Sequence, residues 1–259
     1  MRAAVLRRLL AEPRTRDLDL DDPATTALRR DIVRRKPFLR DIYRDWYRAL
    51  ASAVEGHRPV VELGSGPGFL DEIIPGCVRS EVFVTPGVQL VFDARALPFG
   101  RRAVGALVMT NVFHHIPEPY RFLQQAADAV HVGGVIAMIE PWRSAWSSVV
   151  YTRLHHEPFV ADADPNVAIA GGPLSGANGA LPWIVFDRDR AALAQRAPAW
   201  ELQRVEPMMP FRYLVSGGVS MRALMPGWTT PIWRRIESRF APRMRTWAMF
   251  ALIVLRRRG

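Results

Sequence analysis

The stretch that decides the fold is "PVVELGSGPGFLDE", which runs from Pro59 to Glu72. An apolar run of strand type is followed at once by three glycines at alternate positions, Gly64, Gly66 and Gly68. Glycine has no Cβ, so a turn built from it lets the backbone come close to a ligand. A strand followed by a glycine-rich turn is typical of nucleotide-binding α/β proteins.

Strand-like and helix-like segments alternate on both sides of this turn. Unalternating apolar strands between helices indicate a parallel sheet that is covered on both faces. We therefore predict an α/β protein with a Rossmann-like, doubly wound sheet, whose ligands bind at the carboxyl ends of the strands. The predicted strands are 59–63, 77–81, 88–94, 103–111, 133–141, 200–208 and 248–257, and the predicted helices are 26–54, a helix that begins over 68–74, 119–131, 187–198 and 231–247.

The alternation is interrupted between residues 142 and 185, where aromatic residues and the glycine-rich stretch "GGPLSGANGALP" gather. We interpret this region as an insertion over the mouth of the sheet. The expected organisation is an N-terminal helical segment (1–56), a cofactor-binding core (57–141), a cap insertion over the active site (142–185) and a C-terminal completion of the sheet (186–259). Within the first segment, residues 1 to about 25 are polar and are expected to lie loosely on the surface.

The amino-acid composition limits which classes of protein are possible. The chain has 259 residues, of which 49% are hydrophobic and 23% charged, as in a globular protein. Its one cysteine, Cys77, excludes an internal disulfide framework and fits a reducing, cytoplasmic compartment. The longest apolar run, 247–255, is too short for a membrane-spanning helix, and we predict a buried strand there.

The formal net charge of +10 could attract nucleic acid, anionic lipid or an acidic substrate. Neither basic cluster, 29–40 or 256–258, carries a nucleic-acid motif, so nucleic acid is not the expected partner. Peripheral membrane contact through the arginine-rich helix near 29–36 is a further hypothesis. The sequence does not define the oligomeric state.

The spacing of the glycines distinguishes two classes of ligand. In the dinucleotide fingerprint G-x-G-x-x-G, the third glycine would stand at Phe69. An acid two residues before the first glycine, Glu62, suits a cationic amino group better than a pyrophosphate, because like charges repel. A ligand with a nucleoside and a zwitterionic amino-acid tail fits, and we expect S-adenosylmethionine.

Two further acids support this expectation, because each stands at the end of a predicted strand. Glu81 follows Glu62 by 19 residues, and there a carboxylate can accept hydrogen bonds from both ribose hydroxyls. Asp93 ends the third strand and can accept a hydrogen bond from the adenine amine. Acids at three successive strand ends are a stronger signal than the glycines alone.

With these residues in place, the chain resembles the class I S-adenosylmethionine-dependent methyltransferases, and most of all the broad group that includes the ubiquinone and menaquinone C-methyltransferases. The resemblance runs through "VVELGSGPGF" (60–69), "DARALPF" (93–99) and "VMTNVFHHIPEPYRFLQQAADAVHVGGVIAMIEP" (108–141). It implies a seven-stranded sheet with an antiparallel last strand, for which "AMFALIVLRR" (248–257) is the candidate. It also implies site residues: Glu62, Gly64, Ser65, Gly66 and Gly68 for the methionine part, Glu81 for the ribose, Asp93 and Ala94 for the adenine, and Asn111 and Val112 beside the transferred methyl.

Two pairs of adjacent histidines are candidates for acid–base chemistry. His114 and His115 follow the fourth strand, and His155 and His156 lie in the insertion beside Glu157. Histidine accepts protons near neutral pH, so His115 and His156 are the catalytic candidates where the acceptor must lose a proton. A structural role for the first pair and a surface position for the second are the alternatives. Adjacent histidines space metal ligands poorly, and we expect no metal site.

We expect an S-adenosylmethionine-dependent methyltransferase that acts on a small, aromatic or lipophilic acceptor by in-line methyl transfer. Aromatic residues of the insertion, together with "MMPFRYL" (208–214), favour such an acceptor. Arg143, Arg153 and Arg212 could pair with an acidic group on it. The alternatives are an RNA or protein methyltransferase and a non-catalytic S-adenosylmethionine-binding protein.

Overall fold

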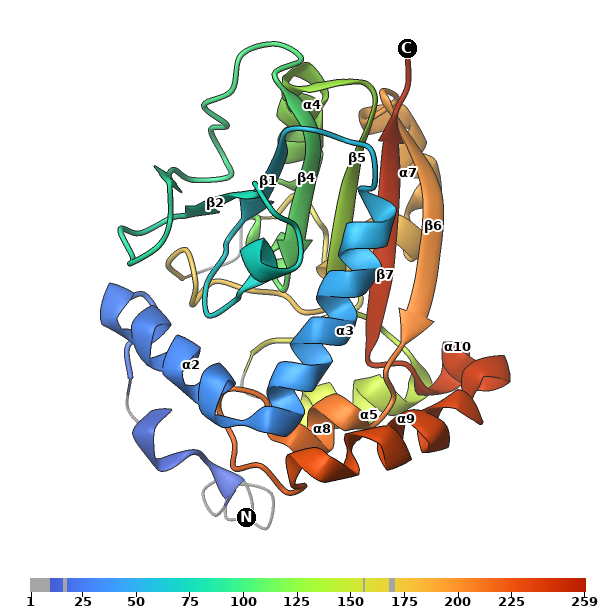
Figure 1. Cartoon of the computed structure of the whole chain (residues 1–259). Coiled ribbons are helices and arrows are strands. Elements are labelled where there is room, and N and C mark those ends of the chain that lie inside the picture. The colour runs from blue at the N-terminus through green and yellow to red at the C-terminus, as the bar shows by residue number, and fades with distance from the viewer. Residues whose placement is uncertain (1–9, 16–17, 156, 168–170) are drawn as a thin grey trace.

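The structure is a computed structural model that describes residues 10–15, 18–155, 157–167 and 171–259. Its centre is a seven-stranded sheet in the order β3-β2-β1-β4-β5-β7-β6 (Figure 1). The strands are β1 (Val60–Leu63), β2 (Val78–Glu81), β3 (Leu90–Val91), β4 (Val104–Thr110), β5 (Val130–Pro141), β6 (Trp200–Met208) and β7 (Phe250–Arg257). The predicted α/β fold is confirmed.

β7 is the antiparallel strand of the sheet, and it lies between β5 and β6. Ile253 pairs with Met138 of β5 on one side and with Val205 of β6 on the other. The remaining neighbours, from β3 to β5, pair in parallel. Residues Phe250–Leu255 are buried, which explains why this run is apolar without alternation.

Helices cover both faces of the sheet. They are α2 (Pro23–Arg35), α3 (Pro37–Ala53), α4 (Pro119–Ala129), α5 (Ala145–Arg153), α6 (Leu181–Trp183), α7 (Arg190–Arg196), α8 (Arg212–Ser216), α9 (Thr230–Ser238) and α10 (Met244–Trp247). Two separate hydrophobic clusters result, one beneath α3 and one beneath α4 and α6. No helix in the described parts of the chain is both long and apolar enough to cross a bilayer.

The predicted helix 26–54 is two helices, because Pro37 interrupts it. A proline disfavours helical backbone at the residue before it, and Lys36 has an extended conformation with φ −102° and ψ 90°. Pro37 then serves as the first residue of α3, a position where its missing N–H costs nothing. The break allows α2 to turn away from α3 toward the edge of the sheet (Figure 1).

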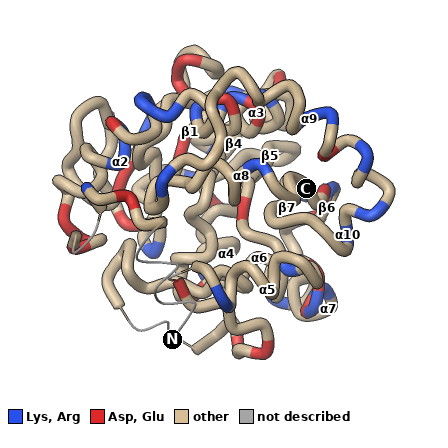
Figure 2. Tube along the Cα trace, turned by 90° about the horizontal axis from the view of Figure 1, so that it is seen from below, with Lys and Arg blue, Asp and Glu red and all other residues tan. Residues whose placement is uncertain are grey.

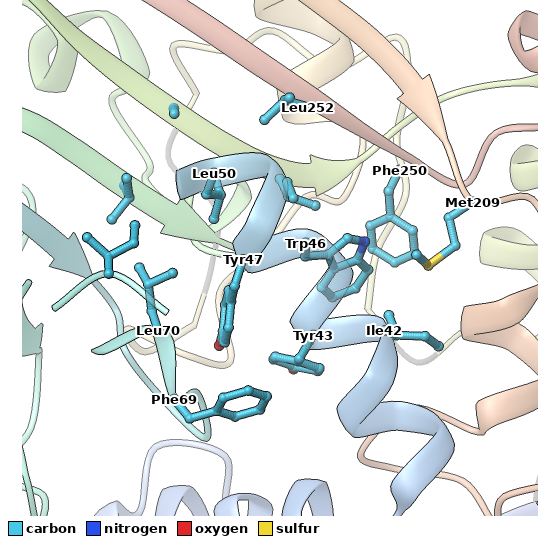
Figure 3. Close-up of a cluster of buried hydrophobic side chains, with 14 of the residues drawn as sticks. Ile42, Tyr43, Trp46, Tyr47, Leu50, Phe69, Leu70, Met209, Phe250 and Leu252 are labelled. Carbon is cyan, nitrogen blue, oxygen red and sulfur yellow. The ribbon is translucent and has the colours of Figure 1, made fainter. Parts of the chain in front are cut away.

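α3 buries an aromatic stripe against the sheet, and Figure 3 shows these side chains pointing toward Phe69 and Phe250. Trp46 packs on Phe250 with ring centroids 4.9 Å apart, and Tyr47 packs edge-on against Phe69 at 5.1 Å. Each such buried ring contributes about 1.5–3 kcal/mol through the hydrophobic effect. The stripe fixes α3 beside the glycine turn.

The helix predicted to begin over 68–74 is wrong. Only a single 3₁₀ turn, η2 (Leu70–Glu72), forms there, and it ends before Pro75 and Gly76. Proline and glycine together are poor helix formers, which gives the physical reason. α3 lies over this part of the sheet face instead, since its core residues share one cluster with Phe69 and Leu70.

Candidate functional site

The glycine turn follows β1 and has a left-handed backbone at two of its glycines. Gly64 has φ +63° and Gly66 has φ +45°, a region that favours glycine. A Cβ on Gly64 would lie 2.5 Å from Cγ2 of Val112, so the close approach of the two chain segments also requires glycine. A Cβ on Gly66 would be in ordinary contact with the Gly64 carbonyl oxygen at 3.8 Å and with Oε2 of Glu81 at 4.0 Å, so its φ alone requires glycine.

The third glycine has a different role, because it meets a helix. A Cβ on Gly68 would lie 2.2 Å from the hydroxyl oxygen of Tyr47 in α3. The Gly68 amide donates to the Ser65 carbonyl at 2.8 Å, which closes the turn. Gly68 therefore allows the glycine turn to sit against α3.

Glu62 is buried behind the glycine turn rather than facing an open cavity. Its side chain is 3% exposed, and Oε2 lies 3.7 Å from Nε of Arg79. Burial raises the pKa of Glu62 to about 7. Glu62, Ser65 and Gly68 are not among the residues that line the cavity described below, so direct ligand contact by these three stays a prediction.

Glu81 is the last residue of β2, and it ties the strand end to the glycine turn. Its Oε2 accepts a hydrogen bond from the Gly66 amide at 2.8 Å, and Oε1 accepts from the Val82 amide at 2.9 Å. The residue is 4% exposed and lines the cavity. A carboxylate has about four lone-pair sites, so both oxygens keep the capacity to accept a ligand hydroxyl.

Asp93 follows the short strand β3 and is held by its neighbour Arg95. Oδ2 accepts from Nη2 of Arg95 at 2.6 Å and from Nε at 2.9 Å. The hydrogen bonds and charge of the Arg95 guanidinium hold the pKa of Asp93 below its usual range. Asp93 and Ala94 both line the cavity, as the sequence predicts for an adenine site.

The end of β4 brings Asn111 and Val112 to the same cavity. Asn111 has φ +56°, a left-handed conformation that non-glycine residues seldom adopt. The amides of Val112 and Phe113 both donate to Oε1 of Glu140 at 2.8 Å, which holds this turn to the end of β5. The turn then continues into η3 (Phe113–His115), which carries the first histidine pair.

His114 bridges two carboxylates. Nδ1 lies 2.7 Å from Oε2 of the fully buried Glu140, and Nε2 lies 3.5 Å from Oε2 of Glu157. Burial by itself lowers the pKa of His114, but the hydrogen bonds and charges of Glu140 and Glu157 outweigh burial and raise the pKa to about 9. His114 is therefore a charged imidazolium at neutral pH, and the ion pair lowers the pKa of Glu157 although burial opposes this.

His115 is neutral beside this ion pair. Its Nδ1 lies 2.9 Å from the Gly176 carbonyl, which can only accept, so Nδ1 carries the proton and Nε2 keeps its lone pair. Burial and then the charge of His114 lower the pKa of His115 to about 4. The two rings are 4.2 Å apart between centroids. His156, the other catalytic candidate, lies outside the described residues.

The histidine pair and Glu157 also offer potential ligand atoms within 4.8 Å of one another, which is close enough for all three to bind one metal ion. The prediction from spacing did not include Glu157, which reaches the histidines from the insertion. The raised pKa of His114 keeps a proton on Nε2 toward Glu157, and a metal ion bound here would have to displace that proton. The arrangement is that of an ion pair next to a neutral base.

One cavity of about 560 Å³ joins these groups. It is lined by seven of the predicted cofactor residues: Gly64, Gly66, Glu81, Asp93, Ala94, Asn111 and Val112. The wall also includes the aromatic residues Tyr43, Tyr151, Phe159, Tyr213 and Phe250, and the polar group His114, His115 and Glu157. A cavity of this size holds a cofactor or drug-sized ligand.

The cavity also offers unsatisfied polar capacity to a ligand. The Thr110 hydroxyl is buried at the cavity wall and has no hydrogen-bond partner among the described residues. Gly66 and Glu81 line the cavity side by side, so a hydroxyl-bearing ligand there could reach a carboxylate and a backbone that carries no Cβ. The residues present thus fit a ligand that has a nucleoside part.

The loop 171–176 of the insertion closes one side of the cavity, and Asp21 holds it there. Oδ1 of Asp21 accepts from the Leu174 amide at 2.7 Å and from the Ser175 amide at 3.2 Å. The expectation that residues up to about 25 lie loosely on the surface is therefore wrong for Asp21 and also for Ala11, which forms a β-bridge with Met221. Sequence analysis missed this role, because the partners are about 150 residues apart.

Three arginines predicted near the acceptor do not line this cavity. Arg212 is buried and pairs with Glu237 at 2.5 Å and Asp45 at 2.6 Å. The guanidinium of Arg143 stacks on Trp183, with its carbon 4.4 Å from the ring centroid. Two other arginines line the cavity: Arg29, from α2, and Arg95, which is bound to Asp93.

A family model described as "Methyltransferase domain" matches residues 77–138. Among solved structures, the chain is similar to the cyclase SpnF at 14% identity, over 83% of this chain and 81% of that chain, with a TM-score of 0.48. It is similar to geranyl diphosphate C-methyltransferase from Streptomyces coelicolor A3(2) at 13% identity, over 85% and 80%, with a TM-score of 0.46. It is also similar to a chain of the complex between the Haloferax volcanii Trm112 methyltransferase activator and a methyltransferase, at 12% identity, over 94% and 100%, with a TM-score of 0.49. No curated protein sequence matches the chain.

The matched domain spans β2 to β5, the elements that carry Glu81, Asp93, Asn111 and the first histidine pair. These elements lie within a seven-stranded sheet that has its antiparallel strand between β5 and β6. The chain therefore has the Rossmann-like α/β fold of class I methyltransferases, and its residues 77–138 match a methyltransferase domain.

Proposed function

We propose that the enzyme transfers the methyl group of S-adenosylmethionine to a small aromatic or lipophilic acceptor. The observation that carries the proposal is the single cavity of about 560 Å³, in which predicted cofactor residues and aromatic side chains share one wall. Mostly apolar walls with a few placed polar groups are the usual composition of small-molecule sites. Residues 142–185 contribute Tyr151 and Phe159 to that wall, which supports their proposed role as a cap.

The proposed cofactor contacts follow from the strand ends. Glu81 accepts from the ribose hydroxyls, Asp93 and Ala94 border the adenine, and the glycine turn approaches the methionine part. Glu62, Ser65 and Gly68 support this turn from behind, where the structure has them. The cofactor supplies a methyl group on a sulfonium centre that is already activated, so the chain's residues contribute mainly positioning and exclusion of water.

His115 is the proposed base for an acceptor that must lose a proton. Its Nε2 has a lone pair at neutral pH because the pKa is lowered to about 4 and Nδ1 is bound to the Gly176 carbonyl. The adjacent imidazolium of His114, paired with Glu140 and Glu157, keeps a second proton off His115 by charge repulsion. Arg29 is the cation of the cavity wall that an acidic group on the acceptor would meet.

The first test is isothermal titration with S-adenosylmethionine, S-adenosylhomocysteine and NAD. We expect micromolar binding of the first two and none of NAD; the opposite preference would overturn our reading of the glycine turn. Turnover is then screened with phenols, quinones and lipid precursors, and quinone precursors come first because of the resemblance noted in the sequence. A phenol or quinone that accepts labelled methyl supports the proposal, whereas methylation of RNA or protein alone would contradict it.

The base is tested with His115→Asn, whose amide nitrogen can replace Nδ1 toward Gly176 but has no Nε2. Turnover of a phenolic acceptor should fall by roughly 10²-fold with cofactor affinity unchanged. His131→Asn is the control, because His131 hydrogen-bonds only locally, to the Val132 carbonyl. Unchanged turnover in His115→Asn would remove His115 from the proton path.

The cytoplasmic location remains part of the proposal, on the ground of the single cysteine, Cys77.

A further inference from the structure

The outer face of η5 (Gly227–Thr229), α9 and the loop before them exposes large apolar side chains. Trp228 is 76% exposed, Ile232 is 53% exposed and Leu224 is 50% exposed. Scattered exposed aliphatic residues are ordinary, but a tryptophan that is three-quarters exposed costs solvation free energy unless something covers it. These three residues lie within nine positions of one another in the sequence, and we refer to them together as the patch.

One side of α9 faces outward, while the opposite side is attached to the fold. Ile232 and Arg235 are three positions apart in α9 and so share one side of that helix, which Trp228 of η5 precedes and the C-cap residue Arg239 follows. The opposite side is fixed to the fold, because Glu237 is buried and accepts from Nε of Arg212. Trp233 packs against the core cluster beneath α3. The patch is therefore held rigidly while its own face stays uncovered.

Positive charge surrounds the patch. The exposed arginines between residues 221 and 247 are Arg222, Arg234, Arg235, Arg239, Arg243 and Arg245. Glu237 is the one acid of this segment, and it is buried against Arg212. Of the exposed arginines, Arg234 is neutralised by Asp45 at 2.8 Å. Figure 2 shows these arginines as blue segments along α9 and the stretch that leads to α10.

We propose that this face docks on the surface of an anionic lipid bilayer. Tryptophan prefers the level of the lipid headgroups, leucine and isoleucine enter the acyl boundary, and arginines attract anionic headgroups. The three kinds of side chain occur here on one rigid face, and the charge complementarity selects an anionic surface. α9 would lie in the plane of the interface and not across the membrane.

In the arginine-rich stretch 29–36, where the sequence predicts membrane contact, Arg34 and Arg35 are exposed, and other basic side chains are bound within the fold. Arg30 donates to the Gly66 carbonyl at 3.0 Å, Arg35 pairs with Asp31 at 2.8 Å, and Lys36 is buried and donates to the Gly218 carbonyl at 3.0 Å. Membrane contact by α2 stays a prediction, and the face of α9 combines exposed arginines with exposed large apolar side chains.

The chain connects the docking face directly to the cavity. Val219 and Ser220 line the cavity, and four residues later Leu224 is part of the exposed patch. Docking through α9 would thus bring the wall of the cavity close to the lipid surface, from which a lipophilic acceptor could enter. Only this last step rests on the proposed function; bilayer binding itself does not.

The test is vesicle co-sedimentation of the full chain, without cofactor or acceptor, so that failure of docking is separate from failure of methyl transfer. We expect binding to phosphatidylcholine vesicles that contain one quarter phosphatidylglycerol and little binding to pure phosphatidylcholine. Arg235→Glu/Arg239→Glu should weaken the binding by about tenfold or more. Trp228→Ser/Ile232→Ser should weaken it to a similar degree through lost apolar insertion. Brominated lipid should quench tryptophan fluorescence, and Trp228→Phe should remove that quenching.

Matched controls keep the result specific. Arg101→Glu/Arg190→Glu reverses two exposed arginines elsewhere, and Val84→Ser/Val132→Ser removes two exposed apolar side chains elsewhere; both should leave vesicle binding unchanged. Equal binding by the α9 variants and the wild type would overturn the proposal. So would sedimentation velocity that shows a dimer dissociated by Trp228→Ser/Ile232→Ser, because the patch would then be covered by a second copy of the chain.

Discussion

The carboxylate of Glu81 accepts a hydrogen bond from the amide of Gly66 at 2.8 Å, so the end of β2 and the glycine turn after β1 form one unit. A β2 residue thus fixes the position of a β1 turn, and both line the same cavity. The same carboxylate is the proposed acceptor for the ribose. Loss of Glu81 should therefore disturb the cofactor twice, through a missing ligand contact and through a loosened turn.

We expect Glu81→Ala to weaken S-adenosylmethionine binding about ten- to a hundredfold, or roughly 1.5–3 kcal/mol, because charge-assisted hydrogen bonds are lost. Isothermal titration measures the change. Glu72→Ala is the control, since Glu72 lies just beyond the same turn and pairs on the surface with Arg40 at 3.4 Å. Equal affinities of a folded Glu81→Ala protein and the wild type would mean that another group holds the ribose.

Gly68→Ala should destabilise the fold by about 1–3 kcal/mol, because the new methyl group would meet the Tyr47 hydroxyl oxygen at 2.2 Å. Tyr47→Phe removes that oxygen, so the double variant should recover part of the loss. Denaturant unfolding of the wild type, both single variants and the double variant gives the coupling energy. Strictly additive losses would show that the strain arises elsewhere, for example at the Ser65 carbonyl, which lies 2.9 Å from the same Cβ position.

The His114 ion pair predicts a decrease of stability in alkaline solution. The pKa of His114 is raised from about 6.5 to about 9 in the folded state, so the folded chain holds this proton more tightly than the unfolded chain. The stabilisation is complete below pH 6.5 and is lost as the pH rises to about 9, with a size on the order of a few kcal/mol. Glu62, with its pKa raised to about 7, changes stability mainly below pH 7.

Thermal unfolding between pH 7 and 9 therefore isolates the contribution of His114. The melting temperature of the wild type should fall steadily over this range, whereas that of His114→Asn should start lower and stay nearly constant. Parallel curves for the two proteins would show that His114 is not charged in the folded state.

Asp21→Ala should release the loop 171–176 from the N-terminal segment, because the carboxylate that accepts hydrogen bonds from the Leu174 and Ser175 amides is lost. We expect the KM for the acceptor to rise by about tenfold, since loosely held positioning loops cost alignment. The affinity for S-adenosylmethionine should change by less than about twofold. Asp162→Ala, an exposed substitution elsewhere in the insertion, is the control. An acceptor KM that stays at the wild-type value would exclude this loop from acceptor binding.

The sequence predicts the sheet and the strand-end acids well, because both signals are local. An apolar run followed by glycines, and an acid at the end of the next strand, are readable without knowledge of the fold. Two of the errors in helix assignment were also local in origin. Pro37 divides the predicted helix 26–54, and Pro75 with Gly76 prevents a helix after the glycine turn.

The remaining features of the site depend on contacts between distant residues. Three contacts join segments more than 20 residues apart: Tyr47 with Gly68, Asp21 with the loop 171–176, and Glu157 with His114. No spacing rule reveals such pairs, since they are created by the packing of α2, α3 and the insertion around the sheet. The protonation states of His114 and His115 follow from those contacts, so they too could not be predicted from the sequence.

The position of β7 has a consequence for how the chain folds during its synthesis on the ribosome. β6 ends at Met208, but its pairing partner begins only at Phe250, and β6 reaches the rest of the sheet solely through that partner. A nascent chain that has not yet released β7 therefore carries β6 without a partner, while β5 is paired only with β4. Exposed edges of this kind invite aggregation. The sheet is thus completed only when β7 follows β6, and chains truncated before Phe250 should be recovered as insoluble material.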